Sequence, residues 1–303
     1  MNIFYTDTSE WEEDYFKFDI FNQINYDSNI NFLLFDDNFN DLEKYKTEKN
    51  IIVTNRGISV SYMETMIENL KPDVLFHLSD ECLDNEDYYE LYRKHKIPLL
   101  FHQYNSNSVN YSNNHFQIPL GYVKYFNDQQ NSLDFHDDPD KIYDFSFIGS
   151  LKSDRNEMLD IFKNNLENNF ISLGSTNWSN AKEQTIEPRR MNDIYKESVF
   201  VPIGRGNTSL DCFRIYEAVI SSSIPVIVGD EEEIEETFYF NGLKPSFVYS
   251  DTWESAIIKC KEILNDKERQ QKIIELNSIW WREVNNFIIN KIKKQFNRYK
   301  DQP

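Results

Sequence analysis

The stretch SVFVPIGRGNTSLDCFRIYEAVISSSIPVIVGD, residues 198–230, carries the clearest fold signal in the chain. It opens and closes with short apolar runs, 199–204 and 224–229, each of strand length and bounded by glycine. Between them lie a polar loop and the segment 210–221, whose apolar residues recur at helical spacing. Two strands connected through a helix run parallel, so the stretch predicts a strand–helix–strand unit.

The same alternation fills the first third of the chain. Apolar runs stand at 2–7, 31–37, 50–55, 73–81 and 97–104. Between the last three runs, residues 59–72 and 84–96 have helical spacing of their apolar residues. The pattern indicates an α/β protein with a doubly wound parallel sheet.

A second series of this kind begins at Tyr143. Strands are predicted at 143–150, 170–174, 199–204 and 224–229, with helices between them. Residues 127–142 are polar and acidic, and we interpret them as a linker. The chain therefore divides into Rossmann-like domains at 1–126 and 143–264, which should face a cleft. Residues 265–303 should form one or two closing helices that pack across both domains.

Composition excludes several classes of function. The chain has 303 residues and a formal net charge of −19, which argues against nucleic-acid binding because such partners demand a basic face. The first 20 residues are acidic and no run of 18 apolar residues occurs, so we expect a cytoplasmic protein. Cys82, Cys212 and Cys260 are far apart and are expected to be free thiols.

The first candidate site is the stretch SFIGSLKSDRNEML, residues 146–159. A strand ends at Gly149 and Ser150, and a helix starts near Ser153. Glycine permits close approach of a ligand, a helix start offers N–H groups to an anion, and Arg155 adds a charged fork. These features suit a diphosphate. The alternative is that Ser153 only caps the helix and Arg155 is simply exposed.

The second candidate is the pair Arg214 and Glu217, which lie on one face of the predicted helix. Glu217 can accept hydrogen bonds from two ribose hydroxyls while Arg214 meets a phosphate. The alternative is an ion pair on a surface helix.

The preceding loop, residues 204–211, adds phosphate-binding groups. It contains two glycines, Arg205, and hydroxyls at Thr208 and Ser209, with Asp211 or Ser209 as the expected helix cap. It lacks the lysine ending of a Walker loop.

The third candidate is Asp80 with Glu81, at the end of the apolar run 73–81. A partly desolvated carboxylate there has the properties of a general base. The alternative is that one of the two caps the next helix.

Neither a metal site nor a hydrolase triad has good support. The DPD triplet at 138–140 mimics a carboxylate ligand pair, but such triplets arise easily in a chain with 51 acidic residues. His77 and His102 end strands near the expected cleft without a Ser or Cys partner.

Together these residues resemble the exostosin-like glycosyltransferases, family 47. The signature is an apolar strand ending in Pro and Gly, a polar loop, R-x-x-E-A and then I-P-V-I, within 198–230. The segments FHLSDE (76–81), IPLGY (118–122) and FSFIGSLKSDR (145–155) are similar to a branch that includes ribitol-type xylosyltransferases. The resemblance covers about residues 73–230.

The resemblance implies a GT-B fold and an inverting enzyme that needs no metal or other cofactor. The second domain would hold a nucleotide sugar, with Glu217 on the ribose and Arg155 and Arg214 on the diphosphate. The first domain would hold the acceptor, a hydroxyl of a glycan or polyol phosphate. Its base would be Asp80 as the first choice and Glu81 as the second. The donor would be a UDP-sugar such as UDP-xylose, UDP-glucuronic acid or UDP-N-acetylglucosamine.

Two departures from the family stand out. Ser222 occupies the helix–strand turn where the family usually has glycine, so the turn must change shape or strain this residue. The membrane anchor of Golgi members is absent, which suggests a bacterial or viral enzyme. The basic end 291–300 could touch a membrane surface, although a solvated helix end is the commoner case. Alternative functions are a fucosyltransferase-like enzyme using a GDP-sugar, or an inactive nucleotide-sugar or glycan-binding module.

Overall fold

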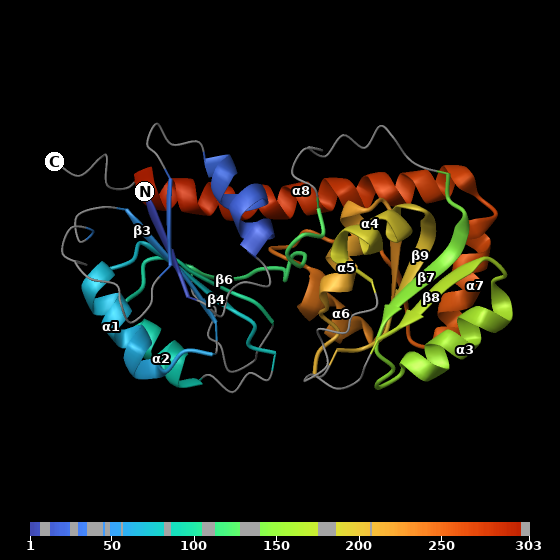
Figure 1. Ribbon diagram of the computed structural model, residues 1–303, viewed down its shortest axis with the longest axis horizontal. Coiled ribbons are helices and arrows are strands. Elements are labelled where there is room, and N and C mark those ends of the chain that lie inside the picture. Colours follow the sequence, from blue (N-terminus) through green and yellow to red (C-terminus); the bar gives the residue numbers. More distant parts are fainter. Residues whose placement is uncertain are drawn as a thin grey trace. The chain divides into compact units, whose positions relative to one another are not determined.

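A computed structural model shows the fold of the chain (Figure 1). The chain divides into two compact units, the first formed by Met1–Leu120 and Asn285–Pro303 and the second by Gly121–Val284. The last helix, α8 (Lys267–Asn297), starts in the second unit and ends in the first. The residues that the structure describes are 1–6, 13–24, 30–34, 45, 49–55, 57–81, 86–104, 113–127, 140–174, 186–206 and 208–297.

The first unit is built on a six-stranded sheet in the order β2-β1-β3-β4-β5-β6, with every pair parallel. Its central strands β3 and β4 are buried along their whole length, which explains their nearly continuous apolar sequences. The strands are β1 (Asn2–Tyr5), β2 (Asn31–Leu34), β3 (Asn50–Asn55), β4 (Val74–Leu78), β5 (Leu100–His102) and β6 (His115–Gln117).

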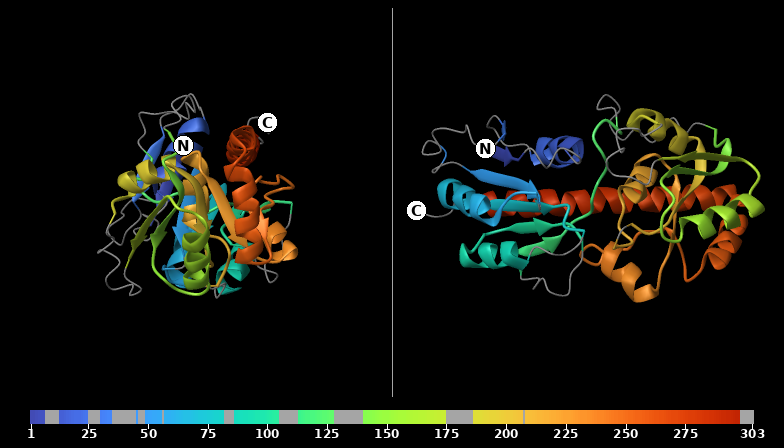
Figure 2. Two further views of the ribbon diagram at one scale, coloured as in Figure 1. Left: turned by 90° about the vertical axis from the view of Figure 1, so that its right-hand side faces the viewer. Right: turned by 60° about the horizontal axis from the view of Figure 1, so that its bottom comes forward.

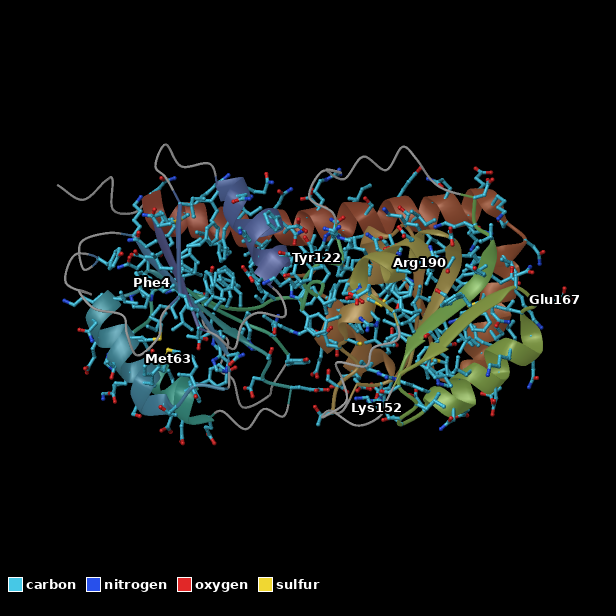
Figure 3. All side chains as sticks on the ribbon, viewed as in Figure 1. Phe4, Met63, Tyr122, Lys152, Glu167 and Arg190 are labelled. Atoms are coloured by element: carbon cyan, nitrogen blue, oxygen red, sulfur yellow. The ribbon has the colours of Figure 1, made fainter. Side chains whose placement is uncertain are left out.

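Helices cover both faces of this sheet. On one face α1 (Val60–Leu70) and α2 (Glu86–Lys94) pack through residues such as Met63 and Leu91 onto the strands (Figure 3). On the other face the rings of Phe16 and Phe21 contact Phe76 of β4. These two rings belong to the short helices η2 (Tyr15–Ile20) and η3 (Phe21–Ile24).

The second unit holds a five-stranded parallel sheet in the order β11-β10-β9-β7-β8. Ser198–Ile203 (β9) is fully buried at its centre, as its apolar sequence requires. The other strands are β7 (Tyr143–Gly149), β8 (Asn169–Leu173), β10 (Ile224–Val228) and β11 (Val248–Ser250).

The helices of the second unit also form two layers (Figure 2). On one face α3 (Arg155–Asn165) and α7 (Trp253–Leu264) enclose a core with Phe145, Phe162 and Val226. On the other face α4 (Pro188–Lys196) and α5 (Phe213–Ile220) contact β9. There Tyr216 of α5 stacks on Trp280 of α8, with ring centroids 6.3 Å apart. The remaining helix is α6 (Glu231–Phe238).

The first five strands of each unit follow the same order. Numbered within its unit, each sheet reads 2-1-3-4-5, a doubly wound order in which the direction of winding reverses between the first and third strands. The predicted α/β class with two Rossmann-like units is thereby confirmed. The reversal point lies between β1 and β3 in the first unit and between β7 and β9 in the second.

The unit boundaries differ in detail from the predicted domain boundaries. The segment 121–126 belongs to the second unit, where Asn192 donates a hydrogen bond to the Phe126 carbonyl (2.9 Å). Most of the predicted linker, 128–139, lies outside the described residues. Within the described part of the predicted closing segment, residues 265–297, there is a single helix, α8, which divides between the units at Val284 and Asn285. Of the described helices, none is long and apolar enough to span a membrane.

Several short elements were not predicted from the sequence. Strands β6 and β11 contain three residues each, too few to produce a recognisable alternation. The helix caps also differ: α3 is capped at Asp154 rather than Ser153, which has φ 52°, and α5 at Cys212 rather than Ser209 or Asp211. Ser222 has φ 56°, the strained left-handed conformation that the family's glycine would accept.

Candidate functional site

The most distinctive polar cluster of the second unit lies at the carboxyl ends of β7 and β9. These two strands flank the reversal point of the sheet, where doubly wound proteins bind ligands. The loop after β7 starts at Ser150, and the loop after β9 starts at Gly204 and leads into α5. Most of the residues predicted to bind a nucleotide sugar therefore belong to this one edge.

Arg155, at the start of α3, joins the two loops. Its Nη1 donates a hydrogen bond to the Ser150 carbonyl (3.0 Å), and its Nη2 donates to the carbonyls of Gly204 (3.5 Å) and Arg205 (3.0 Å). Only 8% of Arg155 is exposed, so it is neither a free anion-binding fork nor the exposed residue of the alternative. Its contact with a diphosphate stays a prediction. The hydrogen bonds that the structure shows hold the loop after β7 against the loop after β9.

Asp154 reinforces this connection and was missed from the sequence. Its Oδ1 accepts a hydrogen bond from the Arg205 backbone N–H (2.9 Å), and its Oδ2 accepts one from Trp253 Nε1 (3.0 Å). A Cβ at Gly204 would lie 2.5 Å from Arg155 Cγ and 2.8 Å from Asp154 Oδ1, so only glycine fits there. The adjacent acid and arginine at the helix start were the available signal.

Arg214 and Glu217 form the ion pair that their spacing predicts. Arg214 Nη1 lies 2.6 Å from Glu217 Oε2, and Arg214 Nε donates to the Ile148 carbonyl of β7 (3.3 Å). Glu217 is fully buried, and its Oε1 accepts a hydrogen bond from the Val123 N–H (3.3 Å). The pair is therefore not on the surface. Burial lowers the pKa of Arg214, but Glu217, Tyr195 and Cys212 together more than offset this, so the pKa is raised overall.

Arg205 is the most exposed of the three arginines, with 40% of its side chain accessible, compared with 21% for Arg214. Its guanidinium makes a two-pronged contact with the Glu233 carboxylate of α6, with Nη1 2.7 Å from Oε1. This bond raises the pKa of Arg205, so the cation is held charged. Glu233 was not identified from the sequence, where it stands within a run of three glutamates.

The rest of the loop supports the entry into α5. Ser209 accepts a hydrogen bond from the Asp211 N–H (3.0 Å), and Asp211 accepts one from the Tyr216 hydroxyl (2.7 Å). Thr208 is exposed. Cys212 occupies the cap position of α5 and makes no side-chain capping bond. The first N–H groups of α5 therefore have no capping side chain, which suits an anion.

Gly149 and Ser150 lie beside Arg155, and their predicted contact with a nucleotide sugar stays a prediction. A Cβ at Gly149 would meet only Phe147 and Arg155 at ordinary contact distances of 3.4 and 3.7 Å, so packing does not require glycine there. The edge thus combines a buried arginine brace, Arg155, with two partly exposed arginines, Arg205 and Arg214. Chemically it can stabilise a dianion such as a diphosphate.

The other predicted group, Asp80 and Glu81, follows β4 in the first unit. Asp80 is completely buried, and the Tyr89 hydroxyl donates to its Oδ2 at 3.5 Å. Glu81 is partly exposed. Neither caps the next helix, because α2 begins only at Glu86. The greater accessibility of Glu81 reverses the order of preference that the sequence suggested for a base.

Gln103 positions the backbone at this edge. Its Oε1 accepts a hydrogen bond from the Ser79 N–H (2.7 Å), and its Nε2 donates to the Leu120 carbonyl (3.3 Å). Ser79 has φ 59°, so a left-handed turn redirects the chain immediately before Asp80. The buried glutamine was a second residue missed from the sequence.

Three histidines of the first unit, His77, His102 and His115, belong to a buried aromatic cluster. His77 Nδ1 lies 2.8 Å from the Tyr92 hydroxyl, and the rings of His102 and His115 are 4.7 Å apart. Burial, with a smaller contribution from His115, lowers the pKa of His77 to about 3. Burial also lowers the pKa of His102 well below its usual value. Both rings are therefore neutral near pH 7, as expected of core residues.

One group of described residues has the spacing of a metal site: Glu64, Glu68 and His95. The Lys94 ammonium lies 2.5 Å from Glu64 Oε1, and hydrogen bonds from Lys94 and His95 lower the pKa of Glu64. A cation already occupies this position, so the group is explained as an ion-pair cluster. The DPD triplet cannot be compared, since Asp138 and Pro139 lie outside the described residues.

Two of the three cysteines are described, and both are free thiols as predicted. Cys260 is buried in the core of the second unit, and burial raises the pKa of both Cys212 and Cys260. Cys82 lies outside the described residues.

Comparison with known proteins gives one family match. Residues 122–297 match the model of the RXYLT1 C-terminal domain, which covers the second unit almost from its first residue and all of α8. No curated protein matches. The match begins at Tyr122, so the segment 76–81, which carries Asp80 and Glu81, lies outside it.

Two solved structures are similar over 99% of this chain and 98% of theirs. One is a β-glucosyltransferase described as a DNA-modifying enzyme, determined with and without uridine diphosphoglucose (14% identity, TM-score 0.46). The other is the T4 phage enzyme BGT in complex with UDP-glucose (13% identity, TM-score 0.45). TM-scores this low carry no functional conclusion.

Proposed function

The chain belongs to the family of the RXYLT1 C-terminal domain, and we propose that it is an inverting glycosyltransferase that uses a UDP-sugar. The observation that carries the proposal is the arginine cluster at the reversal point of the second sheet, because it lies inside the matched region. The acceptor is a hydroxyl of a glycan or polyol phosphate, as the exostosin-like resemblance implies.

In the proposed donor complex, Arg205 and Arg214 contact the diphosphate. They are the two arginines whose side chains are partly exposed at this edge. Arg155 acts as a positioning residue, since its guanidinium already holds the carbonyls of both loops. Glu217 takes the ribose in the resemblance, which requires its bond from the Val123 N–H to be exchanged for ribose hydroxyls.

The remaining groups of the edge complete the donor site. The hydroxyls of Thr208 and Ser209 and the first N–H groups of α5 supply hydrogen bonds to phosphate oxygens. In this scheme Gly149, the last residue of β7, and Ser150, the first residue of the following loop, lie beside the leaving group.

In the proposed reaction a carboxylate of the first unit removes the proton of the acceptor hydroxyl. The acceptor oxygen then bonds to the anomeric carbon from the side opposite the nucleotide, while the bond from that carbon to the diphosphate oxygen breaks. This single displacement inverts the configuration. Negative charge grows on the departing UDP, and arginine cations stabilise it. No metal is required in this scheme.

The donor half is tested by nucleotide binding and UDP release. We expect UDP to raise the melting temperature more than GDP, and one UDP-sugar to give the fastest UDP release. Arg205→Ala should weaken UDP binding about tenfold or more, because a hydrogen bond to a charged group is stronger than a neutral one. Arg190→Ala is the matched control: Arg190 is an exposed arginine of the same unit, 3.7 Å from Asp193.

The nucleotide panel also separates the alternatives. A larger stabilisation by GDP would favour a fucosyltransferase-like enzyme. Equal UDP affinities of the Arg205→Ala and Arg190→Ala variants would remove Arg205 from the donor site.

The acceptor half is tested by Glu81→Gln and Asp80→Asn. If Glu81 is the base, its amide variant should lose at least about a hundredfold in turnover, the usual scale of a general base, with little change in UDP affinity. The Asp80 variant should lose less. UDP binding without UDP release across a broad acceptor set, and no effect of either substitution, would instead assign a binding module.

A further inference from the structure

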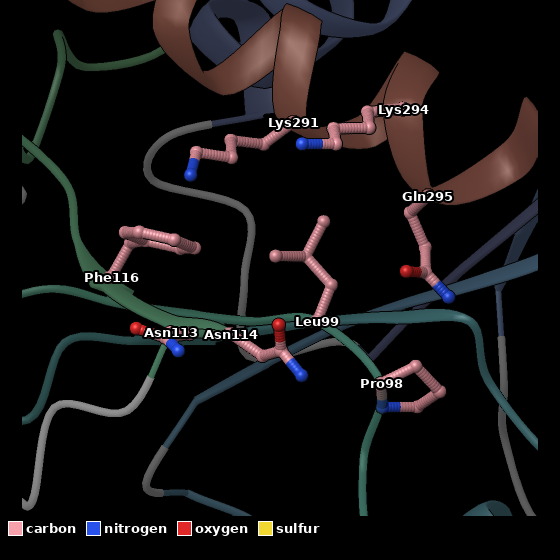
Figure 4. Close-up of a pocket in the computed structure, with 8 residues that line it drawn as sticks. All are labelled: Pro98, Leu99, Asn113, Asn114, Phe116, Lys291, Lys294 and Gln295. Carbon is pink, nitrogen blue, oxygen red and sulfur yellow. The ribbon is translucent and has the colours of Figure 1, made fainter. Parts of the chain in front are cut away.

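The first unit contains a cavity of about 180 Å³ that no part of the proposed reaction uses (Figure 4). It lies between α8 and the segments that lead into β5 and β6, at Leu99 and at Asn113–Asn114. These segments precede their strands, so the cavity is at the amino edge of the sheet. Asp80 and Glu81 follow β4 at the opposite, carboxyl edge. The cavity is therefore separate from the predicted base.

The wall contributed by α8 is cationic. Lys291 and Lys294 extend from the helix toward the cavity, and Figure 4 shows both ammonium groups on the side facing the strand segments. Of the eight described residues that line the cavity, two are lysines and none is acidic. This is notable in a chain with a net charge of −19. The described lining of the cavity therefore has the opposite sign from the protein as a whole.

One of the two cations is held in place by aromatic rings. Lys291 Nζ lies 4.0 Å from the ring centroid of Phe116 and 4.9 Å from that of Phe287. An ammonium over a ring face is attracted by the ring's quadrupole, so its position is restricted before any ligand arrives. A restricted cation loses less conformational entropy on binding an anion than a freely rotating lysine does.

The remaining lining combines carboxamides with an apolar wall. Asn113, Asn114 and Gln295 each carry an NH₂ group capable of donating two hydrogen bonds, and Gln295 is only 6% exposed. Leu99 and the Phe116 ring form the apolar part. An anion with several acceptor oxygens and a short carbon chain matches both parts, since a phosphate offers more acceptors than a carboxylate.

We propose that this cavity binds the phosphate group of a small soluble phosphate ester, held by Lys291 and Lys294. The volume of about 180 Å³ is slightly larger than the roughly 150 Å³ of a cavity that holds benzene, so it accommodates a phosphate with a few attached carbons. The strongly negative net charge of the chain opposes adsorption to an anionic membrane surface, which favours a soluble ligand. The proposal does not depend on the proposed glycosyl transfer.

The test is calorimetric titration of the full chain with glycerol 3-phosphate, inorganic phosphate and glycerol. Glycerol 3-phosphate should bind saturably, inorganic phosphate more weakly because it leaves the apolar wall unused, and glycerol not at all. Lys294→Gln should weaken binding about tenfold, as expected for loss of one charged hydrogen-bond donor. Lys272→Gln, an exposed lysine elsewhere on α8, should leave the affinity unchanged.

A second variant guards against misfolding. Asn113 is exposed on a turn, so Asn113→Asp keeps its shape while placing a negative charge at the cavity. Asn113→Asp should abolish binding of glycerol 3-phosphate and leave the melting temperature unchanged. Because Lys272→Gln changes the net charge by the same amount, a difference between the two variants reports on the cavity and not on the overall charge.

Several results would overturn the proposal. These are an absence of saturable binding, equal affinities for glycerol 3-phosphate and inorganic phosphate, or equal affinities for the Lys294→Gln and Lys272→Gln variants. A fourth overturning result would come from binding to vesicles that contain phosphatidylglycerol. If Lys294→Gln reduces vesicle binding while glycerol 3-phosphate does not bind, these lysines contact a membrane surface and not a soluble phosphate ester.

Discussion

The carboxyl edges of the two sheets differ although the first five strands of both units follow one order. In the second unit, arginines connect neighbouring strand ends: Arg155 holds both loops, and Arg214 reaches from α5 to β7. In the first unit the corresponding connections are neutral. There Gln103 joins Ser79 to Leu120, and His77 pairs with Tyr92.

In the proposed function, this difference lets the same strand order serve two substrates. Buried cations that are already oriented by the fold can stabilise a developing diphosphate without reorganisation. An edge whose described connections lack arginine, and whose partly exposed carboxylate is Glu81, suits a neutral hydroxyl substrate instead. The charge of the edge, more than the order of strands, therefore separates a donor unit from an acceptor unit in the proposed function.

The largest expected effect comes from Arg155→Met, which removes the buried arginine at the carboxyl edge of the second sheet. Three backbone carbonyls would lose a charged donor, and we expect the second unit to lose about 4 kcal/mol of unfolding free energy, less than three independent charged bonds because they are not additive. Urea unfolding followed by tryptophan fluorescence measures this, since Trp253, Trp280 and Trp281 all lie in the second unit.

The matched change in the first unit is Gln103→Met. It removes two neutral hydrogen bonds, and we expect a loss of about 2 kcal/mol, measured by hydrogen exchange of peptides from the first unit. Arg190→Met, an exposed control, should change stability by less than about 0.5 kcal/mol. If Gln103→Met costs as much as Arg155→Met, the charge of the brace is not what distinguishes the edges.

Acid should destabilise the first unit through its buried, uncharged histidine His77. The pKa of His77 is about 3 in the folded chain, and an unfolded histidine has a pKa of about 6.5. Between these values the unfolded chain binds a proton that the folded chain does not. Stability is therefore full above about pH 6.5 and falls as the pH decreases toward 3, by roughly 1.4 kcal/mol per pH unit for this group.

Urea unfolding by circular dichroism at pH 7, 6 and 5 measures the slope. His77→Phe should reduce the loss between pH 7 and pH 5 by about 2 kcal/mol, although His102, whose pKa is also lowered by burial, will maintain part of it. His95→Gln is the control, because His95 lies outside the buried cluster. Identical slopes in the wild type and His77→Phe would show that His77 is not kept neutral by the fold.

Much of the fold could be predicted because parallel strands in doubly wound sheets are long apolar runs. Such runs marked β3, β4, β9 and β10 directly, and the family resemblance read from 198–230 is confirmed by the matched family. That match extends to Asn297, so the carboxyl-terminal helix belongs to the family signal although its sequence showed little of it. Strands of three residues, such as β6, have no period to detect.

The candidate site was predictable in its residues but not in their connections. The sequence identified Arg155, Arg214 and Glu217, yet gave no indication that Arg155 is buried against carbonyls 49 and 50 residues away. Such contacts depend on which strands are neighbours. Asp154 and Gln103 were missed for the same reason, since each binds backbone groups that are distant in the sequence.

The smallest expected effect concerns a feature that the two units share. Ser222 precedes β10 with φ 56°, and Lys71 precedes β4 with φ 44°, so each unit ends a helix in a left-handed residue other than glycine. That conformation costs such a residue roughly 1–2 kcal/mol, partly offset by glycine's greater freedom when unfolded. Ser222→Gly should therefore stabilise the second unit, and Lys71→Gly the first, by about 1 kcal/mol each.

The control for Ser222→Gly is Ser222→Ala. Lys141 donates a hydrogen bond to the backbone carbonyl of residue 222 (2.7 Å), a contact that both variants keep. Ser222→Ala retains the strain and should bring no gain in urea unfolding; an equal gain from alanine would mean that the serine hydroxyl, and not its backbone, is unfavourable there.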